Sequence, residues 1–333
     1  MKQLFLLCGV LLLLCVGCQK PVQYYEVSGR MHTPYHFKFQ HTESLESEID
    51  EQLKYFYHLF NVFDSTSVIS QVNRNEEVEV DSLFQKVFNK AMEVSALTEG
   101  AYDVTCAPLI NLWGFGFSRK DSVTPEHIDS VRQFIGYQKV HINDGHVEKQ
   151  DHRLMMNFSS LADGTVCDMM ASLFEKHGIV NYLVEFGGEM RVKGVNPEGN
   201  NWRLGITKPS DDAAGVNQTL EQIVSFPEPL GMATSGNYRN FYVKDGRKYA
   251  HTIDPREGCP VQRDILSATI VTADAMTADA FATAFMVLGS TEAKELSKRV
   301  PGLEYFIICS DSTKVGYHTE YSEGFRRFLV PKH

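Results

Sequence analysis

The stretch Ala233–Gly258, ATSGNYRNFYVKDGRKYAHTIDPREG, joins a Thr-Ser-Gly turn to a β-hairpin. An Asp-Gly pair at 245–246 separates two strand-like runs, 240–244 and 247–253, and tolerates the positive φ angles of a tight hairpin turn. Proline cannot continue a β ladder, so the second strand is predicted to end at Asp254. The hairpin therefore brings a histidine and an Asp-Pro step to one place.

His251 lies near the end of the second predicted strand. Because side chains alternate along a strand, we expect His251 on the same face as Tyr249 and Ile253. A histidine in this position, flanked by loops of small residues, is well placed to face a ligand. It is equally compatible with a hydrogen-bonded residue of a well-packed hairpin, and the hairpin alone leaves both interpretations open.

The composition excludes one class of partner. The protein has 333 residues and a formal net charge of −10, so nucleic acid is not expected as a partner. The ~315 residues beyond the N-terminal leader are enough for one large domain or two. Strand-like and helix-like runs alternate without a long low-complexity linker or a repeat, which predicts the α+β class.

The N-terminus resembles a lipoprotein signal peptide over residues 1–17. Lys2 precedes an apolar run, Leu4–Val16, that is shorter than the ~20 residues of a membrane-spanning helix. The run ends Cys-Val-Gly-Cys, which resembles a lipobox with Cys18 as the lipidated residue. A lipid anchor would hold the mature chain on the periplasmic side of a bacterial membrane. An ordinary secretory signal without a lipid remains the alternative. The folded domain is expected over residues 24–333.

The cysteines beyond the leader form no metal-binding pair. They are widely spaced and include no CxxC motif, which argues against a zinc site. A disulfide stays open in an oxidising compartment, but buried thiols are the expectation. These cysteines are Cys106, Cys167, Cys259 and Cys309.

A carboxylate and a hydroxyl are predicted on one face of a late helix. Thr277 is a candidate cap for this helix and Gly289 a candidate end. Asp279 and Thr283 are four residues apart, so their oxygens lie on the same face, an arrangement that suits a hard cation. Such a pair is also common on a solvated helix face.

The run NFSSLADGTVCD at 157–168 turns into a second helix, predicted to reach about His177 and to end at Gly178. The start of a helix offers unpaired N–H groups and a positive dipole end, which suit a phosphate. Asp163 lies in the first turns, where a carboxylate alternatively stabilises the helix by about 0.3–1 kcal/mol.

The motifs, in their order along the chain, resemble those of the ApbE family of FAD:protein FMN transferases, which are magnesium-dependent and often lipoproteins. The hairpin is similar to the family pattern ATSG-x-YRNF followed by H-x-IDP-x-x-G. AYDVTCAPLINLWGFG at 101–116 is a second close match. The resemblance spans about residues 29–289 and includes the segments 29–35, 63–73, 157–168, 187–189 and 273–289.

The resemblance implies a T-fold-like, two-lobed α+β domain with FAD in the cleft between the lobes. The implied reaction is the Mg²⁺-dependent transfer of FMN from FAD to a threonine hydroxyl of an acceptor protein. The product is a phosphoester, and AMP is released. The implied acceptors are subunits of flavin-bearing respiratory complexes. Two alternatives stay open: an FAD pyrophosphatase that yields FMN and AMP, and a non-catalytic periplasmic FAD-binding lipoprotein.

The resemblance also implies roles for individual residues. Asp279, Thr283 and the carbonyl of Ser160 are implied as magnesium ligands. His251 is the candidate base for the threonine hydroxyl. Asp254 is expected either to orient that histidine or to bind the ion.

The remaining implied residues contact FAD. Phe63 matches an aromatic that stacks near the isoalloxazine or adenine. Met31 matches a methionine that touches the flavin nucleotide, whereas without the resemblance a lone methionine in a strand would indicate core packing. Asn157 replaces an aspartate of the family and Asp163 a lysine or glutamate, which keeps the non-catalytic alternative open. The expected FAD contacts are Met31, Phe63, Ala101, Tyr102, Asp103, Asn157, Asp163, Thr234, Ser235, Gly236, Arg239 and Ile253.

Overall fold

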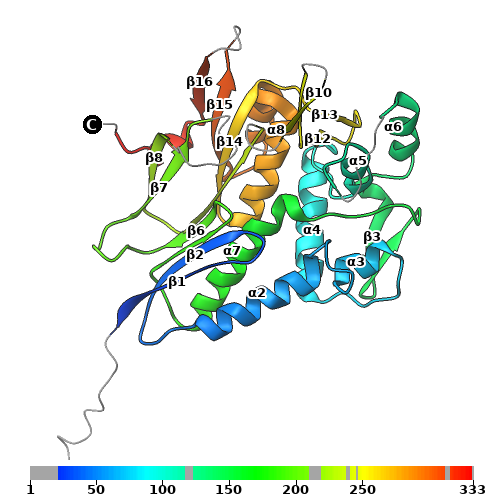
Figure 1. The fold of residues 1–333 in the computed structure, drawn as a ribbon. Coiled ribbons are helices and arrows are strands. Elements are labelled where there is room, and N and C mark those ends of the chain that lie inside the picture. Colours follow the sequence, from blue (N-terminus) through cyan, green and yellow to red (C-terminus); the bar gives the residue numbers. More distant parts are fainter. Residues whose placement is uncertain are drawn as a thin grey trace, which may run out of the picture.

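An eight-stranded antiparallel sheet forms the centre of the computed structural model (Figure 1). The structure describes residues 22–116, 123–209, 219–237, 241–244, 247–311 and 316–331, and only the backbone for 241–244 and 247–250. In spatial order the strands are β1 (Gln23–Arg30), β2 (Pro34–His41), β5 (Tyr182–Phe186), β6 (Glu189–Lys193), β9 (Leu230–Gly236), β14 (Ile265–Thr272), β15 (Glu304–Ser310) and β16 (Tyr317–Tyr321).

Four two-stranded ribbons accompany the sheet. They are β3 (Val140–Asn143) with β4 (His146–Lys149), β7 (Trp202–Thr207) with β8 (Leu220–Phe226), β10 (Phe241–Lys244) with β11 (Arg247–Ala250), and β12 (Ile253–Asp254) with β13 (Cys259–Pro260).

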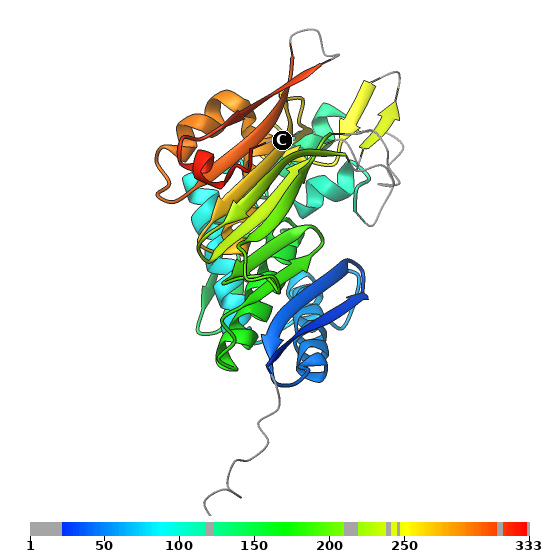
Figure 2. The same ribbon diagram turned by 90° about the vertical axis from the view of Figure 1, so that its left-hand side faces the viewer.

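The helices pack mainly on one face of the sheet. Figure 2, viewed from the side of β7 and β8, shows the strands in front and the helices behind. The helices are α2 (Glu46–Phe60), α3 (Val68–Asn73), α4 (Ser82–Leu97), α5 (Ala107–Leu112), α6 (Pro125–Arg132), α7 (Ser159–Lys176) and α8 (Ala275–Ser297), with the 3₁₀ turns η1 (Tyr137–Lys139) and η2 (Gly324–Phe328).

The middle of the sheet is buried on both faces. Along β9, Ala233 belongs to the main core with α7 and α8, whereas Met232 belongs to a second core with β7, β8 and η2. The neighbouring strand repeats this alternation at Ile270 and Val271. A strand covered on both sides is apolar throughout rather than alternating. This accounts for β14, ILSATIVT, which has no charged side chain and in which seven of the eight residues are buried.

Helices α7 and α8 approach each other closely at Gly164. A Cβ atom at this position would lie 2.4 Å from the carbonyl oxygen of Ala275 and 2.9 Å from Cβ of Asp279. The absent side chain lets the N–H of Gly164 donate to Oδ2 of Asp279 at 3.0 Å. The carboxylate of Asp168, one turn further along α7, accepts the N–H groups of Ala275 and Met276. The start of α8 is therefore fixed to α7.

The structure corrects two details of the predicted helix at 277–289. Its N-cap is Asp274, whose carboxylate accepts the N–H of Thr277, so Thr277 is not the cap. Gly289 does interrupt the helix, with φ 79° and ψ 169°, but the next turns continue to Ser297. The positive φ explains why glycine stands at this break.

The α+β class predicted from the sequence is confirmed, but the interpretation of two strands was wrong. The alternating pattern around Met31 is typical of one edge strand over 29–39, but the structure has a β-hairpin there whose turn contains Met31. The strand expected at 247–253 ends at Ala250, so His251 lies in a bend rather than in a strand. The Asp-Gly pair at 245–246 lies outside the described residues.

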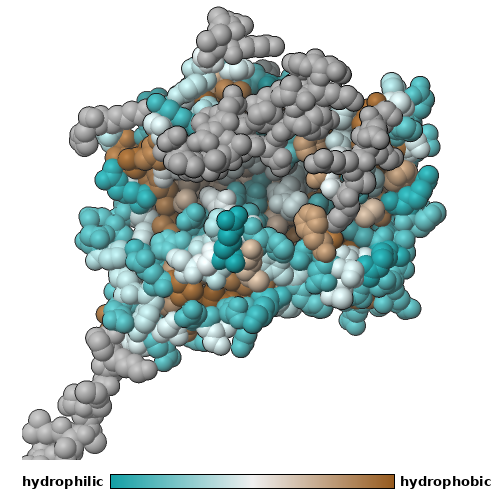
Figure 3. All heavy atoms as spheres, viewed as in Figure 1, coloured by the Kyte–Doolittle hydropathy of each residue, from teal (hydrophilic) through white to brown (hydrophobic). Residues whose placement is uncertain are grey.

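Figure 3 shows that hydrophilic side chains cover most of the described surface on the face seen in Figure 1. In the described part of the chain, no helix combines the length and the apolar character needed to cross a membrane. The predicted signal peptide at 1–17 and Cys18 lie outside the described residues, and these assignments stay predictions, as does the domain boundary at 24.

The substitution Gly164→Ala tests the contact between α7 and α8. We expect it to lower the free energy of unfolding by about 1–3 kcal/mol, because the new methyl group meets the backbone of Ala275. Urea denaturation measures the change. Ser172→Ala, on the exposed side of the same helix, is the control and should change stability by less than about 0.5 kcal/mol. A Gly164→Ala variant as stable as the wild type would contradict the close approach.

Candidate functional site

Two adjoining cavities lie beside the first turn of α7. The first has four carboxylates in its lining, those of Asp103, Asp163, Glu189 and Asp279, and is called the acidic cavity. It brings together segments that are up to 186 residues apart in the sequence, from Ala101 to Val287. Its lining residues are Ala101, Tyr102, Asp103, Cys106, Ile110, Asn157, Ser159, Ser160, Asp163, Glu189, Ser235, His251, Thr252, Ile253, Pro255, Asp279, Thr283 and Val287.

The second cavity is richer in apolar and aromatic side chains and is called the apolar cavity. Its lining includes Phe63 and Phe115, and the side chain of Phe63 is 73% exposed. Four residues line both cavities, so the two are continuous along one wall: Ile110, Asn157, Ser159 and His251. His251 therefore stands at the junction between a carboxylate-lined chamber and an aromatic-lined one.

Three of the four carboxylates of the acidic cavity, all except that of Asp103, come from regular elements far apart in the sequence. Asp163 is on α7, Glu189 begins β6, and Asp279 is on α8. Glu189 and Asp279 are buried, with 8% and 6% exposure, and Asp163 is half-buried. In the described part of the chain, no lysine or arginine forms an ion pair with any of the three. Three like charges thus share a poorly solvated space.

This arrangement raises the pKa of each carboxyl group. Burial raises the pKa of Asp163 to about 6. Burial and then the charge of Asp163 raise the pKa of Glu189 to about 8. For Asp279, burial and the charges of Glu189 and Asp163 raise the pKa well above its usual range, against the opposing hydrogen bond from Gly164. A bound cation would offset all of these costs.

The other polar atoms of the acidic cavity are oxygens that suit a magnesium ion. Thr283 lies one turn after Asp279, and its Oγ1 is 3.4 Å from Oγ of Ser235. Ser160 is in the first turn of α7 and donates its hydroxyl to Tyr102 at 3.1 Å. Hydroxyl, carbonyl and carboxylate oxygens are the ligands of hard divalent cations. The residues present therefore fit Mg²⁺.

The carboxylates do not form a closed cage. Among the described residues, the acidic cavity provides no three carboxylate oxygens that all lie within 4.8 Å of one another. A protein Mg²⁺ site commonly uses one or two carboxylates and completes its shell with water and substrate phosphates. A Mg²⁺ ion held by these carboxylates would therefore complete its shell with such additional ligands.

The loop that carries Ala101, Tyr102 and Asp103 is held rigidly at the cavity wall. The carboxylate of Asp103 accepts the N–H groups of Thr105 and Tyr137, both at 2.8 Å. The Asp103 side chain therefore connects the loop at Thr105 to the turn at Tyr137. Burial raises the pKa of this carboxyl group. Ala101 and Tyr102 are buried and line the acidic cavity. Asp103 lines the same cavity, and the contact of these three residues with FAD stays a prediction.

Asn157 fixes the backbone just before α7 through two hydrogen bonds. Its Oδ1 accepts the N–H of Ser159 at 2.9 Å, and its own N–H donates to the carbonyl of Val104 at 2.8 Å. An amide oxygen performs this backbone contact as well as a carboxylate does. The replacement of the family's aspartate by asparagine therefore leaves this part of the wall intact.

Asp254 lies away from the walls of both cavities. It is fully buried, and its two oxygens accept hydrogen bonds from Nε of Arg256 at 3.0 Å and Nη2 at 2.8 Å. Arg263 contacts it as well, at 3.5 Å. Asp254 lines neither cavity. The prediction that it orients His251 or binds the ion is wrong, because two arginines already occupy its carboxylate.

Three other predicted contacts lie away from the cavity walls. Thr234 directs its hydroxyl toward Thr269, at 2.8 Å, on the opposite face of β9 from Ser235, although its backbone N–H lowers the pKa of Glu189. Met31 is 39% exposed in the β1–β2 turn, and Gly236 ends β9. None of the three lines either cavity, whereas Ile253 and Ser235 do. Arg239 lies outside the described residues.

Glu189 is the site residue that the sequence analysis missed. The segment Gly187-Gly188-Glu189 was placed beside the site, but no role was given to its carboxylate. The sequence does mark this position by its two adjacent glycines, Gly187 and Gly188, which have φ values of 73° and 111° in the structure. A Cβ at Gly187 would lie 2.2 Å from Oδ2 of Asp163, so this glycine is what allows Asp163 and β6 to meet.

Comparisons with known proteins agree with this arrangement. The model of the ApbE family matches residues 31–307. The FAD:protein FMN transferase of Vibrio cholerae is 34% identical over 332 residues, which are 96% of this chain and 96% of that protein. The FAD:protein FMN transferase of Escherichia coli K12 is 33% identical over 295 residues, 86% of this chain and 82% of the relative.

Solved structures share the fold. The flavin transferase ApbE from Vibrio cholerae has a TM-score of 0.82 at 33% identity and covers 93% of this chain and 100% of its own. The apo flavinyl transferase ApbE of Pseudomonas stutzeri has a TM-score of 0.80 at 27% identity, covering 94% and 98%.

The raised pKa values predict how the stability of the metal-free protein depends on pH. In the native state the pKa of Glu189 is about 8 and that of Asp163 is about 6. In the unfolded chain both carboxyl groups lose their protons near pH 4. Between these values the native state binds more protons, so the free energy of unfolding falls as pH rises. In EDTA we expect a loss on the order of 3 kcal/mol between pH 5 and pH 8, since one pKa unit is worth about 1.4 kcal/mol.

Urea denaturation at the two pH values, with EDTA and with Mg²⁺, measures this dependence. Mg²⁺ should restore more stability at pH 8 than at pH 5, and Glu189→Gln should flatten the pH dependence in EDTA. Glu295→Gln, an exposed carboxylate on α8, is the control. The same free energy of unfolding at pH 5 and pH 8 in EDTA would show that the pKa values of the carboxyl groups are not raised in the native state.

Proposed function

The chain belongs to the ApbE family, and we propose that it is an FAD:protein FMN transferase. The proposal extends to the chemistry: Mg²⁺-dependent transfer of FMN to a threonine hydroxyl of an acceptor protein, with release of AMP. The main structural support for this function is the junction of the two cavities, where His251 lies between the carboxylates and the aromatic wall. The names of the relatives support the activity, and the geometry supports the assignment of roles.

We assign the flavin or adenine ring of FAD to the apolar cavity. Phe63 and Phe115 supply aromatic surface there, and an aromatic contact contributes about 0.5–1.5 kcal/mol beyond the area that it buries. The pyrophosphate would then reach the first turn of α7 at Ser159 and Ser160, which line the acidic cavity. The N-terminus of an 18-residue helix favours negative charge at that point.

Asp279, Thr283 and the carbonyl of Ser160 are the proposed magnesium ligands, and the structure adds Glu189 and Asp163 as nearby carboxylates. When bound, the ion supplies charge neutralisation and Lewis acidity at the pyrophosphate. Gly164 holds Asp279 in place through its N–H, and the contact between α7 and α8 fixes the direction of that carboxylate. The protein thus provides a preformed set of oxygens.

His251 is the proposed general base. It accepts the proton of the threonine hydroxyl as the threonine oxygen forms a bond to the FMN phosphorus. The bond from that phosphorus to the bridging oxygen breaks, and AMP leaves with the bridging oxygen. Cys106, Ile110 and Ile253 give the acidic cavity an apolar side beside the histidine. That side reduces access of competing water.

The site of action is part of the proposal. Residues 1–17 are proposed as a signal peptide and Cys18 as the lipid-anchored first residue of the mature chain. This places the domain on the periplasmic side of a bacterial membrane, where its acceptors would be flavin-bearing subunits of membrane-bound redox complexes. The sequence of the leader supports this location.

Incubation with FAD, Mg²⁺ and a threonine-bearing acceptor tests the activity. Mass spectrometry of the intact acceptor should show a gain of one FMN less one water, with AMP in equal amount. AMP and free FMN without an acceptor gain would indicate a pyrophosphatase instead. Bound FAD that stays intact would indicate a binding protein.

His251→Ala is expected to lower the rate of FMN transfer by about 10²–10⁴-fold while FAD still binds, because only the base is removed. The rate of acceptor labelling and an FAD titration monitored by flavin fluorescence measure the two effects. His152→Ala, an exposed histidine outside both cavities, is the control. An undiminished labelling rate in His251→Ala would reject His251 as the base.

Asp279→Ala is expected to raise the Mg²⁺ concentration for half-maximal transfer by at least about tenfold, because a metal ligand is lost. A magnesium titration of the labelling rate measures this change. Glu295→Ala, on the exposed surface of the same helix, should leave the titration unchanged. If the Asp279→Ala curve coincides with that of the wild type, Asp279 is not a ligand.

A further inference from the structure

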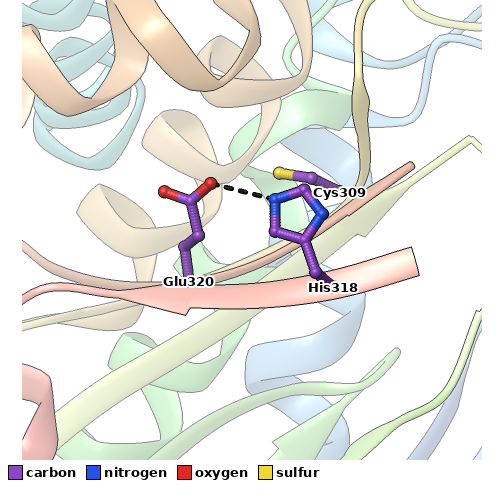
Figure 4. A group of neighbouring side chains, drawn as sticks. All are labelled: Cys309, His318 and Glu320. Carbon is purple, nitrogen blue, oxygen red and sulfur yellow. Dashed lines mark hydrogen bonds and ion pairs between the residues drawn. The ribbon is translucent and has the colours of Figure 1, made fainter. Parts of the chain in front are cut away.

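A second group of potential metal ligands lies at the edge of the central sheet, outside both cavities. Cys309 is on β15, and His318 and Glu320 are on the edge strand β16 (Figure 4). Cys309 and His318 are directly paired in the antiparallel register, so their side chains leave the same face of the sheet. Glu320 follows His318 by two residues and shares that face.

We propose that Cys309, His318 and Glu320 bind a divalent transition metal ion of the zinc type. One potential ligand atom from each residue lies within 4.8 Å of the other two. Thiolate sulfur, imidazole nitrogen and carboxylate oxygen together are the donor set of zinc rather than of magnesium. Three protein ligands leave the fourth tetrahedral position open for water or an added ligand.

The contacts within the group are compatible with metal insertion. A nitrogen of His318, Nε2, lies 3.1 Å from Oε1 of Glu320, so an ion can replace the proton between them. The other carboxylate oxygen, Oε2, accepts a hydrogen bond from Lys294 on α8 at 2.7 Å. Carboxylate ligands of metals are commonly held by such an outer contact, which fixes the orientation of the carboxylate. Lys294 therefore directs Oε1 toward His318.

The thiol of Cys309 lies on the buried side of the proposed site, and the imidazole of His318 lies on the side that faces the solvent. Cys309 is 1% exposed, and burial, with the charges of Asp264 and Glu320, raises the pKa of its thiol to about 12. Without a metal it is protonated, and coordination releases that proton to the solvent as the metal–sulfur bond forms. The side chain of His318 is 53% exposed, which gives an ion a route from the solvent.

Binding at this site would join the edge strand to its neighbour. Within the described residues, β16 is paired on one side only, with β15. An ion held by Cys309 on one strand and by His318 and Glu320 on the other adds a cross-link between them. A ligand that binds only the native state also stabilises it, so the ion should raise the unfolding temperature.

Co²⁺ is the probe for this site, because a cobalt–thiolate bond gives a near-ultraviolet absorption band that oxygen ligands do not give. We expect the reduced, EDTA-treated mature chain to bind one Co²⁺ with this band, and Zn²⁺ but not excess Mg²⁺ to abolish it. The unfolding temperature should rise with Zn²⁺. Absence of the band, or its loss with Mg²⁺, would overturn the proposal.

Variants assign the band to the three residues. Cys309→Ser should remove it, and His318→Ala and Glu320→Gln should each weaken Co²⁺ binding by at least about tenfold. His318→Ala keeps the test valid if Cys309→Ser fails to fold, because His318 is largely exposed. A band that survives in Cys309→Ser, or unchanged affinity in His318→Ala, would refute the assignment.

Two controls separate this site from other groups in the chain. His141→Ala removes a similar His–Glu contact, 2.9 Å from Glu148, on a strand pair that has no cysteine. Cys106→Ser removes the thiol of the acidic cavity. Both variants should keep the cobalt–thiolate band, and its loss in Cys106→Ser would place the bound ion in the acidic cavity instead.

Discussion

The burial of three unpaired carboxylates in one poorly solvated cavity is the constraint on which the site depends. Burial raises the pKa of Asp163, Glu189 and Asp279, the charge of Asp163 raises the pKa of the other two further, and the charge of Glu189 adds to the rise at Asp279. Natural proteins rarely keep unpaired carboxylates in such a position unless a cation or a proton offsets the cost. The cavity also offers hydroxyl oxygens, so a hard divalent ion is the partner that satisfies both the charge and the donor atoms.

Close backbone packing creates this cavity. Gly164 lets α7 and α8 meet, and Gly187 lets β6 approach the carboxylate of Asp163. Asp168 completes the arrangement by accepting the first N–H groups of α8, which fixes the turn that leads to Asp279. The large sheet, whose middle strands are buried on both faces, holds these elements at fixed positions. A substrate with a pyrophosphate then meets charges whose places are already determined, which is how preorganised electrostatics lowers a barrier.

Sequence patterns predicted the parts of the site that depend on local spacing. Asp279 and Thr283, one helical turn apart, and Ser160 at a helix start do line the acidic cavity, as does His251. The patterns failed at Asp254, whose carboxylate is paired with Arg256 and Arg263, two and nine residues further along the chain, because spacing alone does not show which partner a carboxylate takes. Glu189 gains its importance only from neighbours 26 and 90 residues away, Asp163 and Asp279. The metal site proposed at Cys309 could not be predicted from cysteine spacing, because the pairing of Cys309 with His318 follows from strand register, which one-dimensional spacing does not show.

The most direct test of this account is the number of protons released when Mg²⁺ binds to the nucleotide-free protein. Titration calorimetry near pH 7, repeated in two buffers with different ionisation enthalpies, separates proton release from the heat of binding. The account predicts one bound ion per chain with release of protons, because the carboxyl groups with raised pKa must ionise to become ligands. Binding of Mg²⁺ without any proton release, or no binding, would contradict the claim that the buried carboxylates form the metal site.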